Sequence, residues 1–332
     1  MKTSSVRGIV LAVLLYGCFA GVSFHPYLKH ISGMQHFFIF NCFAAAIGAY
    51  ILSRRWIFSF VASLIAGAIY GFGPFALGFV CYHPFAGLVY AAIPYSLLPA
   101  VYLSKWTNPG LKPLVSSLLA GLLSLLPFAM VLLSFKIAAM SYLYAMPVET
   151  TATGGAFFAL LFPLFRPLHT LPPSVFHLPL AGGIIGMILL VESKRVWITI
   201  LLIASLVLSF YEPIGIVPPV IWLSIPVLMI SLIVASGLQA LIVAGRADSI
   251  WLGTAGAVLA AAGLTGFVLS QNTQNNFLYS AQLYALATIT IFTIFFMARA
   301  NIAAHKLRAL IILLACSADI VITTTLLMQT IF

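Results

Sequence analysis

Residues 136–180 read KIAAMSYLYAMPVETTATGGAFFALLFPLFRPLHTLPPSVFHLPL and separate two long, nearly uncharged hydrophobic halves of the chain. Six prolines fall between Pro147 and Pro179, and Glu149 and Arg166 lie on either side of the small polar run 150–155. Proline removes a backbone donor and crowds the preceding turn of a helix. We therefore expect helices on both sides of this stretch and an irregular backbone within it.

The composition of the whole chain is that of a membrane protein. Of its 332 residues, 63% are hydrophobic and only 6% are charged, whereas soluble domains carry roughly 25% charged residues. The mean hydropathy is +1.17. The apolar runs are continuous rather than alternating, which favours helices over a membrane barrel. The sequence predicts an all-α fold, a polytopic integral membrane bundle that spans the lipid bilayer.

Eleven runs are long enough to be considered as spans, within a range of ten to twelve. They cover residues 8–24, 35–52, 56–78, 85–104, 113–135, 175–191, 196–211, 217–245, 250–270, 277–298 and 309–331. Prolines 218, 219 and 226 predict that the run 217–245 begins kinked or broken. Two transmembrane halves are expected, five helices within 1–135 and six within 175–332.

The distribution of lysine and arginine predicts the orientation. With the N-terminus in the cytoplasm and residues 137–174 not crossing, twelve of these cations lie inside and three lie outside, namely Lys29, Lys136 and Arg166. If the central segment crossed fully, seven would lie inside and eight outside, which fits no orientation. The bias therefore predicts an inner (cell) membrane protein with a cytoplasmic N-terminus and an extracytoplasmic C-terminus.

The same count predicts that 137–174 is a re-entrant or interfacial hairpin at the outer face. Irregular backbone at membrane depth is tolerated only where protein or a water-filled cavity surrounds it. A cavity open to the outside is therefore expected beside residues 136–174.

Charge and cysteine content exclude several classes of function. The formal net charge of +10 is spread in small groups between apolar runs, with no basic patch that would bind nucleic acid. The four cysteines have no metal-ligand spacing, and no cofactor is predicted. The N-terminal residues also resemble a lipoprotein signal ending at Cys18. A retained first span is expected, with cleavage and lipidation as the alternative.

Asp319 is the sharpest candidate for a functional site. It lies near the middle of the predicted span 309–331, where an ionisable group costs at least ~2.5 kcal/mol. Thr323 follows one helical turn later, within hydrogen-bonding reach. Two interpretations stay open: a coupling site for a proton or cation, or a carboxyl group that ties two helices together.

The central stretch supplies the other ligand or ion-binding candidates. Glu149 and Arg166 form an ion pair or face the expected cavity, and Thr151 and Thr153 offer hydroxyl groups to a polar ligand or belong to a tight turn. Of the histidines, His83, His169 and His177 are weak candidates for a metal site. The pattern is more typical of interfacial aromatic side chains than of a metal site.

Three functions are consistent with these features. The first is a secondary transporter or exporter of a small solute, with Asp319 coupling a proton or cation. The second is a membrane enzyme acting on a lipid-linked substrate at the outer face, with Glu149 as base and Arg166 and His169 as its partners. The third is a non-catalytic membrane subunit of a larger complex. The sequence favours the transporter and leans away from an enzyme, because its midplane acid lies far from the hairpin.

Overall fold

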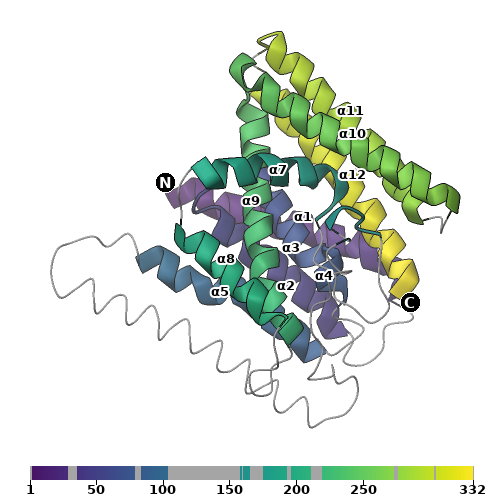
Figure 1. Ribbon diagram of the computed structural model, residues 1–332. Helices are drawn as coiled ribbons and strands as arrows, with labels where there is room; N and C mark the ends of the chain where they lie inside the picture. The colour runs from purple at the N-terminus through teal and green to yellow at the C-terminus, as the bar shows by residue number, and fades with distance from the viewer. Residues whose placement is uncertain are drawn as a thin grey trace.

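The computed structural model is helical throughout the part of the chain that it describes, with no strand there (Figure 1). The described residues are 2–28, 36–78, 84–103, 158, 160–164, 175–192, 196–210, 219–272, 276–302 and 304–331. The helices before the central stretch are α1 (Lys2–Phe24), η1 (His25–Tyr27), α2 (His36–Ser53), α3 (Phe60–Phe72), α4 (Pro74–Gly78) and α5 (Pro84–Leu103). Those after it are α7 (His177–Glu192), α8 (Val196–Leu208), η5 (Pro219–Leu223), α9 (Ser224–Val243), η6 (Arg246–Asp248), α10 (Ser249–Asn272), α11 (Asn276–Arg299) and α12 (His305–Ile331).

Six helical segments in the described residues are long and apolar enough to cross a membrane. They are Val6–Tyr27, Phe60–Gly78, Ile221–Val243, Arg246–Gln271, Phe277–Arg299 and His305–Gln329. Three more apolar helices are shorter, at Phe38–Ser53, Gly87–Leu98 and His177–Leu190. The all-helical fold is confirmed, and these six helices are compatible with a membrane protein, whereas the described residues hold fewer candidate spans than the eleven predicted. The predicted span 113–135 lies outside them.

Two breaks within predicted spans have local causes. The run 56–78 is divided at Gly73, where the backbone is extended (φ −69°, ψ 164°) before α4 restarts at Pro74. The run 217–245 begins as the short 3-10 helix η5 and continues as α9, as its prolines predict.

Helices from both sides of the central stretch share one hydrophobic core, in which α3 packs against α9 and α12. Figure 1 shows α10 and α11 running side by side as a hairpin next to α12, and α7 lying across α9. The α7–α9 crossing depends on glycine. A Cβ atom added at Gly186 would overlap the carbonyl group of Ile233, and one added at Gly237 would overlap the carbonyl group of Gly182. These two backbones therefore touch directly.

The described lysines and arginines all lie at one end of the bundle, which we call the basic end. This end combines the start of α1, the α2–α3 and α9–α10 connections, and the α11–α12 turn, and its cations are Lys2, Arg7, Arg54, Arg55, Arg246, Arg299, Lys306 and Arg308. Gln239 of α9 accepts hydrogen bonds from the backbone N–H groups of Phe58 (2.6 Å) and Ser59 (3.1 Å) before α3.

Arg308 fixes α9, α11 and α12 to one another at the basic end. Its side chain is buried, and its guanidinium donates to the carbonyl group of Ala244, which caps α9, and to that of Ile302 after α11 (2.8 Å). A cation at the C-terminal ends of two helices interacts favourably with their exposed carbonyl groups. The side of a membrane that this end faces stays a prediction from the sequence.

Candidate functional site

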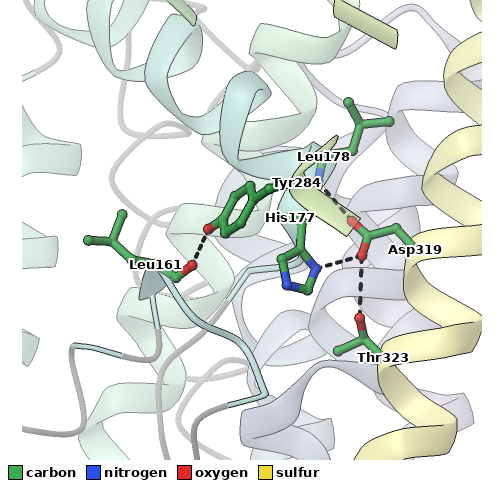
Figure 2. Close-up of polar contacts among 6 residues, drawn as sticks. All are labelled: Leu161, His177, Leu178, Tyr284, Asp319 and Thr323. Atoms are coloured by element: carbon green, nitrogen blue, oxygen red, sulfur yellow. Dashed lines mark hydrogen bonds and ion pairs between the residues drawn. The ribbon is translucent and has the colours of Figure 1, made fainter. Parts of the chain in front are cut away.

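Asp319 lies about halfway along α12 and is almost fully buried (1% exposed). Figure 2 shows three hydrogen bonds converging on its carboxylate. The first joins Nδ1 of His177 and Oδ1 (2.8 Å), and in the second the backbone N–H of Leu178 donates to Oδ2 (2.8 Å). Thr323 Oγ1 donates to Oδ1 as well (3.3 Å), so the predicted contact one turn along the helix is confirmed.

The bond from Leu178 makes Asp319 the cap of another helix. Leu178 is the second residue of α7, and the first N–H groups of a helix have no partner within that helix. A carboxylate satisfies such a donor and interacts favourably with the positive end of the helix dipole. Asp319 therefore allows α7 to begin inside the bundle, about halfway along α12.

This geometry corrects the prediction for residues 175–191. The sequence predicted a full span, but α7 has 16 residues and begins beside the middle of α12 rather than at an end of the bundle. Val175 and Phe176, which precede it, are buried. A non-helical backbone can lie at this depth because protein surrounds it.

His177 is completely buried between Asp319 and Tyr284. Its ring meets that of Tyr284 edge to face, with centroids 4.8 Å apart and an interplanar angle of 85°. Its Nε2 atom has no hydrogen-bond partner among the described residues. A buried acceptor or donor left unpaired costs about 1–3 kcal/mol. Nε2 is therefore the ring nitrogen of His177 whose hydrogen-bonding capacity is unused among the described residues.

Tyr284 connects the pair to the central stretch. Its hydroxyl group donates to the carbonyl group of Leu161 (Figure 2). The next residue, Phe162, is buried and packs edge to face against Phe277 (5.4 Å between centroids) and Tyr284 (6.2 Å). Phe277 is the second residue of α11 and lies at the end of the bundle opposite the basic end. Part of the central stretch thus lies between that end and His177.

The backbone N–H of Leu178 and the hydroxyl group of Thr323 both donate to the carboxyl group of Asp319, as suits its ionised form. When this carboxyl group is ionised, Nδ1 of His177 carries the hydrogen of the 2.8 Å contact and Nε2 has the free lone pair. Tyr284 and Cys316 are the other titratable side chains beside Asp319 in the described residues, and the described lysines and arginines are all at the basic end.

The structure thus brings together three residues from the sequence-based list: Asp319, Thr323 and His177. Six others lie outside the described residues, namely His83, Glu149, Thr151, Thr153, Arg166 and His169. Within the part that is described, no three histidine, cysteine or acidic side chains are grouped to hold a metal ion. His177 forms its hydrogen bond with the carboxyl group of Asp319.

Sequence reasoning missed Tyr284 and the backbone N–H of Leu178. Tyr284 is one of 13 tyrosines and stands in an apolar helix without a motif. A backbone donor has no sequence signature at all. The prolines before Val175 signal where a helix can begin, but they do not indicate the depth of that point in the membrane.

The chain matches no protein-family model, no curated protein and no solved structure.

Proposed function

We propose that the protein is a secondary transporter or exporter of a small solute, and that Asp319 and His177 bind the coupling proton. The observation that carries the proposal is the 2.8 Å contact between two buried ionisable side chains halfway along α12, at the start of the 16-residue helix α7. Ionisable side chains inside membrane spans are costly and mark ion pathways and proton relays. Helices that begin within the membrane form the binding sites of many transporters.

In this proposal the proton binds at Nε2 of His177. The imidazole then becomes an imidazolium that keeps its Nδ1–H bond to Asp319, and the pair changes from one negative charge to none. Histidine suits this role because one of its ring nitrogens can accept a proton while the other keeps its hydrogen bond. The carboxylate also holds the start of α7, so the charge change acts on the position of that helix.

The rest of the proposed architecture follows from the predicted orientation. The basic end faces the cytoplasm, the N-terminus with it, and the C-terminus is extracytoplasmic in the cell membrane. Residues 136–174 form a re-entrant hairpin from the outer face, between the transmembrane halves 1–135 and 175–332. The packing of Phe162 against Phe277, at the end opposite the cations, supports this entry side. Glu149, Thr151, Thr153 and Arg166 would face the resulting cavity.

No contact among the described residues favours the enzyme, because Glu149, Arg166 and His169 lie outside them. Nor does any contact favour a subunit role. We therefore put forward the transporter alone, with the lipid bilayer as its environment.

The test is proton movement in proteoliposomes that contain a luminal pH dye. Pools of amines, amino acids, sugars and carboxylates are added outside, and the luminal pH is followed. We expect one pool to move protons in the wild type, and Asp319→Asn to lower that rate at least about tenfold.

Asp248→Asn is the matched control, because it removes a carboxylate that is exposed at the basic end. It should transport at the wild-type rate. The proposal would be contradicted if the wild type moved protons with none of the pools. It would also be contradicted if the Asp319→Asn variant moved protons at the wild-type rate.

A further inference from the structure

An open groove of about 260 Å³ lies where α7, α9 and the start of α10 meet, at the basic end. Its wall is apolar over most of its surface, with Ile185 and Leu189 from α7, Leu241 and Val243 from α9, and Trp251 from α10. Asp248 is the one acidic residue in the lining. The groove therefore has an apolar floor and a polar end, as a site for an amphiphile requires.

The rim of the groove is apolar and exposed. Val243 and Trp251, which line the groove, are 59% and 47% exposed, and Ile250, next to Trp251 in the chain, is 73% exposed. Large apolar side chains exposed together at the end of membrane-length helices are typical of a surface in contact with lipid. Tryptophan in particular is enriched at the level of the lipid head groups.

The polar end of the groove is lined by the carboxylate of Asp248, and Arg246 lies near it in the same short helix η6. Oδ2 of Asp248 accepts the backbone N–H of Gly245 (2.8 Å), which fixes the carboxylate in the η6 turn. Arg246 precedes it by two residues, is exposed, and makes no ion pair with a described residue. A purely anionic head group would be repelled by the carboxylate of Asp248. A head group with both a phosphate and an ammonium group can pair with Arg246 and Asp248 at the same time.

We propose that this groove binds a phospholipid with an ethanolamine head group. One acyl chain occupies the apolar floor, the ammonium group donates to Asp248, and the phosphate group accepts from Arg246. A choline head group has no N–H to donate, and a glycerol head group leaves the phosphate charge unbalanced beside the carboxylate. The proposal needs only a membrane around the bundle, so it stands independently of the transport function.

Trp251 provides the readout, because bromine atoms on an acyl chain quench nearby tryptophan fluorescence. The full chain is placed in bilayers of unlabelled phosphatidylcholine that contain a fraction of brominated phosphatidylethanolamine, phosphatidylcholine or phosphatidylglycerol. The chain has five tryptophans, so the Trp251 component is the difference between the wild type and Trp251→Phe. We expect brominated phosphatidylethanolamine to be preferred about two- to fivefold, the range of a partly exposed ion pair.

Two variants separate the contributions of the head group. Asp248→Asn keeps an oxygen for the Gly245 N–H but loses the charge, so the preference for ethanolamine over choline should fall to about onefold. Arg246→Gln should weaken the binding of phosphatidylethanolamine and of phosphatidylcholine by the same factor, so the preference between these two lipids should not change. An ethanolamine preference that survives in Asp248→Asn would overturn the proposal. So would a preference for phosphatidylglycerol, or quenching that is the same in Trp251→Phe.

Discussion

Asp319→Ala is expected to lower the free energy of unfolding by about 3–6 kcal/mol, since it leaves buried donors unpaired at three positions. Nδ1–H of His177, the N–H of Leu178 and the hydroxyl group of Thr323 all lose their acceptor. No described lysine or arginine is near enough to compensate, and Asp319 and His177 are both buried. A loss of this size is a large fraction of the 5–15 kcal/mol that holds a typical protein folded. Unfolding of the purified protein in detergent micelles, followed by circular dichroism, measures it.

Asp319→Asn is the variant that distinguishes structure from function. Its side-chain oxygen still accepts the N–H of Leu178 and caps α7, so we expect it to lose less than half as much stability as Asp319→Ala. It removes the negative charge that holds a proton on His177, so its transport should be lost. Equal stability of the alanine and asparagine variants would contradict the role of Asp319 as the cap of α7.

Gly237→Ala is expected to prevent the normal packing of α7 against α9, at a cost of about 3 kcal/mol or more. The added Cβ atom would occupy the position of the Gly182 carbonyl group, and a backbone atom cannot rotate away as a side chain does. Gly186→Ala should have a similar effect, because its Cβ atom would overlap the Ile233 carbonyl group. Yield of monodisperse protein and the midpoint of thermal unfolding are the measurements.

Gly183→Ala is a matched control on the same helix. A Cβ atom there would have its nearest neighbour at 3.5 Å, the Cγ2 atom of Val234, which is an ordinary van der Waals distance. Alanine also favours a helix over glycine by about 1 kcal/mol, so this variant should be at least as stable as the wild type. If Gly183→Ala and Gly237→Ala were equally destabilised, the close backbone crossing would not be the cause.

The sequence predicted the helical membrane class and most of the helix positions, because long apolar runs have few other stable forms in a bilayer. It also identified Asp319 and its neighbour Thr323, since an acid in an apolar run stands out and a residue one turn away is within reach. These are local properties of single runs. They required no knowledge of how the helices pack.

The sequence could not predict the partner of Asp319. His177 is 142 positions away from it, and nothing in the local pattern around either residue indicates their pairing. For the same reason the sequence predicted a full span at 175–191, although α7 begins halfway along α12. An apolar run shows that a helix is favoured there, but the depth at which it begins depends on the acceptor that another helix supplies.

The pairing makes the start of α7 dependent on the charge of α12. The carboxylate of Asp319 in α12 forms hydrogen bonds with the side chain of His177, the first residue of α7, and with the backbone N–H of Leu178, the second. On the other side of His177, Tyr284 holds the carbonyl group of Leu161 in the central stretch. A proton on His177 would therefore act on three segments at once. This is the arrangement that a coupled transporter requires, because its ion site and its moving parts must be connected.

The central claim, a proton bound reversibly by Asp319 and His177, can be measured without a known solute. The chain contains two aspartates, Asp248 and Asp319, so Asp248→Asn labelled with ¹³C-aspartate reports the Asp319 carboxyl group alone. Solid-state NMR in lipid bilayers would follow that signal as the pH is lowered. The account predicts a reversible change that disappears in a variant that also carries His177→Gln. A signal that stays constant while the protein remains folded, or one that changes identically without His177, would contradict it.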